Sequence, residues 1–315
     1  MNEHSLPVYS DRSILAERGP KNAVNSVRPY GWMVEKELTA SGKIEDTAII
    51  FLTNMECPFH CLMCDLWKNT TDQPVSPGDI PMQIEYALDK LPRVKHIKLY
   101  NSGSFFDTRA IAEYEYVKIA SLLSGFETVI VESHPRFIGQ KCIEFRDMLG
   151  AKLEIAIGLE AADDDMLIRL NKKMTTAEFA NSVRFLTDNN ISTRAFILLR
   201  PPFLSEEEGI EMAKTSLRFA FSTGVNCCTV IPVRSGNGIM DKLQKDGLFT
   251  PPDLSSLECV LEYGISLGKG RVFADTWDLK LFSNCDKCID LRTERIIAMN
   301  NTQKISERME CGCKQ

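Results

Sequence analysis

Short apolar, β-branched runs alternate along the chain with longer segments in which apolar residues recur every three or four positions. The short runs predict buried strands and the longer segments predict amphipathic helices. Strands are predicted at residues 47–53, 94–100, 128–132, 152–158, 192–199 and 225–231, with a seventh at 270–274. Helices are predicted between them at residues 82–91, 109–123, 137–149, 175–189 and 205–223.

Two of these helices carry recognisable start signals. Thr175 precedes an apolar stripe formed by Phe179, Val183 and Leu186, so it is a candidate N-cap. Ser205 is followed by three glutamates, which is a capping-box pattern with an acidic first turn. Strands that alternate with helices predict βαβ units around a parallel sheet, either open and doubly wound or curled into a barrel. In both forms, ligands bind at the carboxyl ends of the strands.

Three cysteines stand directly after the first predicted strand. Cys57, Cys61 and Cys64 form a C-x3-C-x2-C motif. Thiolates are the ligands of iron–sulfur clusters, and a 4Fe–4S cluster normally takes four of them, so a motif of three leaves one iron open to a small molecule. The same spacing would also place the three side chains on one face of a helix, as small buried residues. Because three of the 11 cysteines fall within eight residues, the sequence favours the cluster.

A second group of cysteines lies near the end of the chain. Cys285 and Cys288 form a C-x2-C pair, and Cys311 and Cys313 form a C-x-C pair. Four thiols in this pattern can supply the tetrahedral set of a structural zinc, or they can hold a second iron–sulfur cluster. A disulfide pair is the alternative, and a cytosolic location disfavours it. The other cysteines, in helix or strand contexts, are expected in the core: Cys142, Cys227, Cys228 and Cys259.

Polar residues at the ends of the predicted strands are candidates for binding a cofactor. Ser102, Gly103 and Ser104 follow the second strand, where a glycine between two serines lets backbone approach a ligand. Glu132 and Glu160 close the third and fourth strands, and a carboxylate there can accept hydrogen bonds from ribose hydroxyls. The alternatives are an ordinary loop and two capping or surface acids.

Several basic residues are further candidates. Arg200 and Arg194 could each bind a carboxylate through both arms of the guanidinium. His134 is either a loop residue that caps its own backbone or an acid–base group. Residues 171–173, Asn-Lys-Lys, are interpreted as a solvated turn.

Composition narrows the class of protein. A chain of 315 residues with 44% hydrophobic residues can bury the core of one large α/β domain. It has no apolar run of 18 residues and no apolar signal segment, so a cytoplasmic protein without a membrane partner is expected. The 37 Lys and Arg against 43 Asp and Glu give a net charge of −6, which is not the basic footprint typical of nucleic-acid binding.

The cysteine motif after a first strand resembles the radical S-adenosylmethionine (radical SAM) superfamily. Within it, the chain is similar to the archaeosine-biosynthesis lyases, which are related to the elongator catalytic subunit. The stretches that carry this likeness are residues 57–67, 158–160, 198–204, 284–288 and 311–313. The superfamily often has an aromatic residue before the last cysteine, where this chain has Met63.

The resemblance implies a partial (βα)6 TIM-type barrel at residues 45–275, an N-terminal extension at 1–44 and a cysteine-rich metal-binding tail at 276–315. It implies a 4Fe–4S cluster on Cys57, Cys61 and Cys64, and S-adenosylmethionine beside the strand-end candidates: Ser102, Gly103, Ser104, Glu132, Glu160 and Arg200. It also implies an electron donor such as flavodoxin or ferredoxin, and a lysine-modified deazaguanine in tRNA as the substrate.

Two other functions stay open from the sequence. One is a radical SAM activity on a small molecule or a peptide, which the acidic balance favours. The other is a non-catalytic metal-binding scaffold, in which both cysteine groups are structural.

Overall fold

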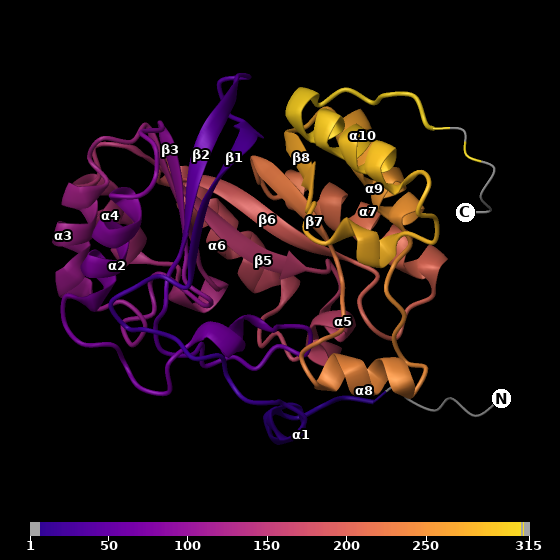
Figure 1. Cartoon of the computed structure of the whole chain (residues 1–315), viewed down its shortest axis with the longest axis horizontal. Coiled ribbons are helices and arrows are strands. Elements are labelled where there is room, and N and C mark those ends of the chain that lie inside the picture. Colours follow the sequence, from indigo (N-terminus) through magenta and orange to yellow (C-terminus); the bar gives the residue numbers. More distant parts are fainter. Residues whose placement is uncertain (1–6, 310, 312–315) are drawn as a thin grey trace.

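One curled sheet organises the computed structural model, which describes residues 7–309 and 311 (Figure 1). Its eight strands lie side by side in chain order. The first two strands pair antiparallel, and every later neighbour pairs parallel. The strands are β1 Gly31–Leu38, β2 Ile44–Phe51, β3 His96–Tyr100, β4 Thr128–Glu132, β5 Lys152–Glu160, β6 Ser192–Leu199, β7 Cys227–Pro232 and β8 Arg271–Ala274.

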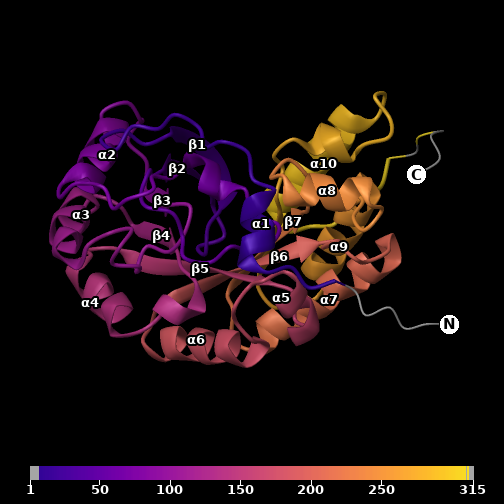
Figure 2. The same cartoon turned by 90° about the horizontal axis from the view of Figure 1, so that it is seen from below.

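Helices cover the convex face of the sheet, as the view from below shows (Figure 2). The same view shows α1 lying across the opening that the curled sheet surrounds. The helices are α1 Asp11–Ala16, α2 Asp79–Leu88, α3 Tyr116–Leu122, α4 Gln140–Met148, α5 Asp164–Arg169, α6 Thr176–Asp188, α7 Glu206–Ser222, α8 Ile239–Lys245, α9 Leu254–Ser266 and α10 Ile289–Thr302.

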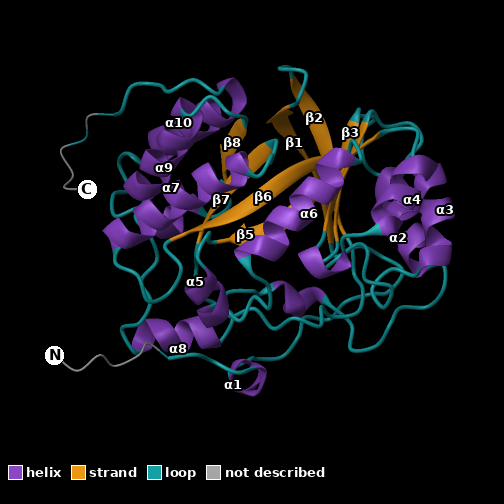
Figure 3. Cartoon of the chain, turned by 180° about the vertical axis from the view of Figure 1, so that it is seen from behind, coloured by secondary structure: helices purple, strands orange, loops and turns teal. Residues whose placement is uncertain are grey.

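The strand order fixes which end of the barrel can carry a site. The hairpin between β1 and β2 projects at one end, and α1 and α8 lie at the other (Figures 1 and 3). Because β2 to β8 are parallel, their carboxyl ends share the end at which α1 and α8 lie. Loops that follow these strands therefore meet there.

The two faces of the sheet differ in chemistry because side chains alternate along a strand. Ala48 and Ile50 of β2 belong to the main apolar core under the helices, so Thr47, Ile49 and Phe51 point to the concave face. By the same alternation, the concave face also carries several polar and aromatic residues from other strands: Lys98, Tyr100, Glu132, Glu154, Arg194, Phe196 and Arg271. Closed barrels usually fill this space with branched apolar residues.

The helix starts follow the local sequence signals. Thr175 and Ser205 each form a capping box, with Glu178 and Glu208 as the reciprocal partners. Phe179, Val183 and Leu186 are buried on the inner face of α6. Both capping predictions are therefore confirmed.

The predicted strands are all present, but the sheet is wider than the expected six strands. β2 to β7 correspond to the six, and β8 to the seventh. β1 was not predicted, and it lies within residues 1–44, which were assigned to an N-terminal extension. Its half-exposed pattern, with polar Glu35 and Lys36 in the middle, lacks the apolar run that marked the other strands.

The last strand is protected from further pairing by side-chain amides of α10. Asn300 accepts from the N–H of Ala274 and donates to its carbonyl, at 2.9 Å in both cases. Gln303 does the same for Val272, at 2.7 and 2.8 Å. Edge strands need such cover because their backbone groups would otherwise pair with another chain.

Among the described residues, no helix combines the length and apolar character needed to span a membrane.

Candidate functional site

The loop that carries Cys57, Cys61 and Cys64 follows β2 at the carboxyl end of the barrel. These residues form a loop with one turn and no helix, so the alternative of a buried helix seam is excluded. The N–H of Leu62 donates to the carbonyl of Leu170 at 2.9 Å. The amide of Asn237 donates to the carbonyls of Leu62 and Cys64, at 2.8 and 3.1 Å.

The three thiols lie in a desolvated setting. Burial raises the pKa of Cys57, Cys61 and Cys64 to about 12. Thiols in this setting ionise when a metal binds them, because coordination removes the proton. The three sulfurs do not all lie within 4.8 Å of one another, so they do not converge on a single ion. A cluster fits this arrangement, because each thiolate of a cluster binds a different iron.

A buried ammonium group lies beside these thiols. Lys172 is 8% exposed, and its charge acts on all three cysteines. Its Nζ donates to Glu160 Oε1 at 2.5 Å. The prediction of a solvated turn at 171–173 is therefore wrong for Asn171 and Lys172, because the turn after helix α5 packs against the cysteine loop, where Asn171 donates to the carbonyl of His60. A lysine between Asn171 and Lys173 gives no sequence signal of this burial.

Gly158 makes room for the Lys172–Glu160 pair. A β-carbon at this position would overlap both the carboxylate of Glu160 and the ammonium of Lys172. Glu160 itself has a positive φ of 64°, and the pairing of β5 with β6 shifts register between Gly158 and Glu160. The irregularity at the end of β5 is thus what turns Glu160 toward Lys172.

His134 supports both the cysteine loop and Lys172. Its ring stacks on Phe59 of the cysteine loop, with centroids 4.0 Å apart. Nε2 lies 3.0 Å from the carbonyl of Lys172 and Nδ1 accepts from the N–H of Arg136, so the neutral ring with the proton on Nε2 satisfies both contacts. Burial lowers the pKa of His134 to about 3. Of the two roles considered for this residue, the observed contact with Arg136 is that of a loop histidine that caps its own backbone.

The Ser102–Ser104 loop lies against the cysteine loop. A β-carbon on Gly103 would lie 3.4 Å from that of Cys57. Glu132 is directed at this loop: its Oε1 accepts from the N–H of Asn101 at 2.7 Å. Burial is the main cause that raises the pKa of Glu132 to about 7. Ser104 accepts from the N–H of His134 at 2.9 Å, so loop and histidine are linked.

The side chain of Arg200 contacts a different part of the chain. Its Nη1 binds Glu206 and donates to the carbonyl of Pro251 at 2.9 Å. Its guanidinium thus joins the start of α7 to the segment before α9.

The N-terminal segment passes over the cysteine loop and is tied to it by charges. Arg18 and Lys21 both pair with Glu56, at 2.6 and 2.8 Å. The hydroxyl of Tyr30 lies 3.1 Å from that of Ser102. Sequence reasoning missed these contacts, because they join residues that are 35 or more positions apart.

Comparison with known proteins places this geometry in context. No family model matches the chain. An uncharacterized protein of Methanocaldococcus jannaschii is 28% identical over 275 residues, which cover 81% of this chain and 75% of the relative. Archaeosine synthase subunit beta of Thermococcus kodakarensis is 27% identical over 255 residues, covering 76% and 78%. Its counterpart in Methanosarcina acetivorans is 24% identical, covering 62% of this chain and only 59% of the relative.

Solved structures show the same architecture. Elp3 of Methanocaldococcus infernus aligns with a TM-score of 0.53 at 16% identity, over 69% of this chain and 59% of that one. Methylornithine synthase (PylB) aligns with a TM-score of 0.50 at 15% identity, over 79% and 68%. The chain has the partial-barrel fold of radical SAM enzymes. The predicted resemblance to these enzymes is confirmed, and so is the predicted partial-barrel fold.

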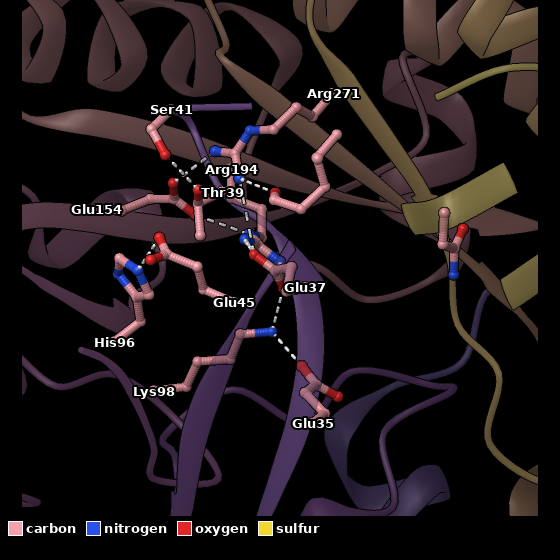
Figure 4. Close-up of polar contacts among 12 residues, drawn as sticks. Glu35, Glu37, Thr39, Ser41, Glu45, His96, Lys98, Glu154, Arg194 and Arg271 are labelled. Carbon is pink, nitrogen blue, oxygen red and sulfur yellow. Dashed lines mark hydrogen bonds and ion pairs between the residues drawn. The ribbon is translucent and has the colours of Figure 1, made fainter. Parts of the chain in front are cut away.

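At the opposite end of this radical SAM fold, charged residues fill the concave face (Figure 4). We call Glu37, Lys98, Glu154, Arg194 and Arg271 the charged floor. Arg194 binds both oxygens of Glu37, at 2.5 and 3.0 Å, and donates to Glu154 at 2.7 Å. Arg271 binds the other oxygen of Glu154 at 3.1 Å, and Lys98 binds Glu37. The guanidinium of Arg194 is therefore occupied by Glu37 and Glu154. Its side chain lies in the barrel interior.

The second cysteine group of the radical SAM fold lies at the start of α10. The sulfurs of Cys285, Cys288 and Cys311 all lie within 4.8 Å of one another. Those of Cys285 and Cys311 are 3.9 Å apart. Cys313, the fourth predicted ligand, lies outside the described residues. Of the four cysteines expected in the core, Cys142, Cys227 and Cys228 are buried. Cys259 is partly exposed.

Proposed function

We propose that this chain is a radical SAM enzyme whose catalytic cluster is held by Cys57, Cys61 and Cys64. The observation that carries the proposal is a triplet of desolvated thiols on the loop at the carboxyl ends of the strands, with the buried Lys172 beside it. When bound, a 4Fe–4S cluster with one open iron supplies an electron that cleaves S-adenosylmethionine to a 5′-deoxyadenosyl radical, which takes hydrogen from the substrate.

The residues around the thiols have roles that follow from their contacts. The ammonium of Lys172 offsets negative charge on the thiolates, which favours cluster assembly in a site of low dielectric. Glu160 holds Lys172 in place, and Glu132 fixes the Ser102–Ser104 loop. We propose that this loop and the two glutamates line the place of S-adenosylmethionine. Arg200, which was also a candidate, would take part only if it left Glu206.

We propose a modified deazaguanine in tRNA as the substrate, with a lyase reaction. The support is the likeness to two proteins named archaeosine synthase subunit beta. A cavity of about 730 Å³ near the N-terminal segment has two cations in its lining, Arg136 and Lys173, although Glu178 also lines it. These two cations could bind phosphates of a tRNA backbone locally, although the net charge of the whole chain is −6. A flavodoxin or ferredoxin would supply the electron.

We propose that the C-terminal cysteines bind zinc, with Cys313 as the fourth ligand. A tetrahedral zinc with bonds of about 2.3 Å places its sulfur ligands about 3.8 Å apart. The observed 3.9 Å between the sulfurs of Cys285 and Cys311 fits this geometry. A second iron–sulfur cluster fits less well, because its thiolates bind separate irons.

A division at residue 275 and a cytoplasmic location belong to this proposal, whereas the pairing of β1 with β2 brings residues 31–38 into the barrel unit. A second candidate, a radical SAM activity on a small molecule or peptide, is favoured by the acidic net charge. Binding of bulk tRNA with a steep dependence on salt would count against it.

Anaerobic reconstitution tests the catalytic proposal. Wild-type protein loaded with iron and sulfide, then reduced with S-adenosylmethionine, should release 5′-deoxyadenosine. Cys57→Ala should not, whereas Cys142→Ala, which changes a buried thiol of α4, should behave as wild type. Equal 5′-deoxyadenosine from wild type and Cys57→Ala would refute the proposal, and zinc without acid-labile sulfide would favour a scaffold.

A further inference from the structure

Aromatic rings line the concave face between the cysteine loop and the charged floor. Phe51 and Tyr100 are the last residues of β2 and β3, and their ring centroids lie 6.2 Å apart. Both are only partly buried although they point into the barrel. On one side, Phe51 contacts Tyr30, whose hydroxyl meets Ser102 next to the cysteine loop. These rings therefore lie within the reach of chemistry at the cysteine loop.

Trp277 extends this aromatic surface across the open side of the barrel. Its ring meets Phe51 edge to face, with centroids 5.9 Å apart. The residue follows β8, whereas Phe51 ends β2, and these strands are not neighbours in the sheet. Trp277 is nevertheless 49% exposed, so one side of a large apolar ring is left uncovered. Aromatic faces of this kind bind flat rings by stacking.

Asp275 supplies a hydrogen-bond acceptor beside these rings. It follows the last residue of β8, accepts from the N–H of Trp277 at 3.1 Å and accepts from Arg234 at 3.0 Å. A carboxylate offers about four acceptor positions, so it can take further donors. The charges of the floor bind one another, whereas Asp275 pairs with Arg234 and lies two residues from the exposed Trp277.

Tyr100 adds a donor on the other side. Burial raises the pKa of its hydroxyl to about 12, so the group stays protonated at neutral pH. Tyr100 ends β3, on the same face of the strand as Lys98, and its ring contacts Phe196 of β6 with centroids 6.3 Å apart.

From this arrangement we propose that Phe51, Tyr100 and Trp277, together with Asp275, bind a flat heteroaromatic ring whose edge carries N–H donors. A guanine-type ring has this chemistry, because its ring N–H and amino group can donate side by side to one carboxylate. The inference rests on the proposed function for the claim that this ring is the one attacked. The binding site itself stands on the geometry of the rings and the carboxylate.

Binding of a free base tests the site without requiring turnover. The protein, reconstituted with its cluster and supplied with S-adenosylmethionine, is titrated with 7-deazaguanine, and binding is followed by calorimetry and by quenching of tryptophan fluorescence. Trp277→Leu should weaken binding by roughly tenfold or more, the scale of one base–aromatic stacking contact. The matched control is Trp32→Leu, which changes another half-exposed tryptophan that packs on Tyr86 outside the barrel and should bind as wild type.

Asp275→Asn tests which edge of the ring is recognised. Wild type should prefer 7-deazaguanine to 7-deazaadenine, which lacks the paired N–H donors, and the variant should lose roughly tenfold of that preference. Equal binding of both bases by wild type, or an unchanged preference in Asp275→Asn, would overturn the role of Asp275. Competition between S-adenosylmethionine and the base would overturn the site as a whole, because the rings would then hold the adenosyl group.

The two proposals can fail separately. If the protein makes 5′-deoxyadenosine but Trp277→Leu binds 7-deazaguanine as tightly as wild type, the proposed ring site is wrong and the radical chemistry stands. If the base binds as described but no 5′-deoxyadenosine forms, the ring site stands and the proposed function fails.

Discussion

The two cysteine groups of this chain arrange the same side chain in different ways. Cys57, Cys61 and Cys64 lie beside the buried ammonium group of Lys172, on the loop after β2, and their sulfurs do not all lie within 4.8 Å of one another. Cys285, Cys288 and Cys311 converge within 4.8 Å at the start of a helix. Spread thiols suit a cluster that leaves one iron open, whereas converged thiols suit a single closed ion. The separation of the sulfurs thus distinguishes the two groups better than their spacing in the sequence does.

The residues that surround the two cysteine groups also differ. The first group lies beside Lys172 and His134, whose positions are fixed by Glu160 and by backbone contacts. Near the second group, ion pairs hold α10 and the segment after it against α9. Arg295 binds Glu258 and Glu262, and Arg308 binds Glu262. One region is organised around the thiols and Lys172, and the other around the docking of α10 and the segment after it.

The largest expected effect is that each cysteine group can lose its metal without affecting the metal at the other group. Cys61→Ala should remove acid-labile sulfide and all 5′-deoxyadenosine formation while zinc remains. Cys288→Ala should remove zinc and leave the sulfide content per folded protein unchanged. Elemental and sulfide analysis of both variants checks this, and loss of both metals in either single variant would show that the groups are not independent.

The substitution Lys172→Met should have the next largest effect, on both stability and cluster reduction. It leaves Glu160 buried without its partner, and breaking such a pair costs roughly 3–5 kcal/mol of unfolding free energy. It should also make the cluster harder to reduce, since a nearby positive charge favours the reduced form. Urea unfolding and a redox titration measure both effects. Lys173→Met, at a neighbouring exposed position, is the control and should change neither.

The pH dependence of stability should report on His134. Its pKa falls from the usual 6.5 to about 3 in the folded protein, so below pH 6.5 the unfolded chain binds a proton that the folded chain does not. Stability should therefore fall by up to about 1.4 kcal/mol per pH unit as the pH drops from 6.5 toward 3. His134→Gln, which can still donate to the carbonyl of Lys172, should remove this contribution. Anaerobic urea titrations at pH 6.5 and 5.5 compare the two, and equal slopes would contradict the assignment.

The smallest effect concerns the tail. Glu262→Gln should weaken the pairs with Arg295 and Arg308, at a cost of about 1 kcal/mol, because Arg308 is largely exposed. Zinc should then be lost to a chelator faster, with no change at the iron–sulfur cluster. A chelator competition assay measures this, and faster loss of iron instead would break the distinction between the two regions.

Sequence reasoning predicted the parallel strands because each is an apolar run between turn signals, and it placed Cys57, Ser102, Glu132 and Glu160 at strand ends. It missed β1, whose residues alternate without a continuous apolar run. It also missed α10, whose exposed Leu291 and Ile297 and buried Arg292 and Arg295 obscure the usual apolar stripe. The site roles of the predicted residues remain predictions.

By itself, the sequence determined the order of the parallel strands, the cysteine motif and the end of the sheet where that motif lies. These features follow from local periodicity and from the polarity of parallel strands. The tertiary structure alone decided that Lys172 is buried beside the thiols, that Glu132 faces the Ser102–Ser104 loop and that Trp277 reaches Phe51 across the barrel opening. Such contacts join distant segments, and no local pattern of residues encodes how a curled sheet brings them together.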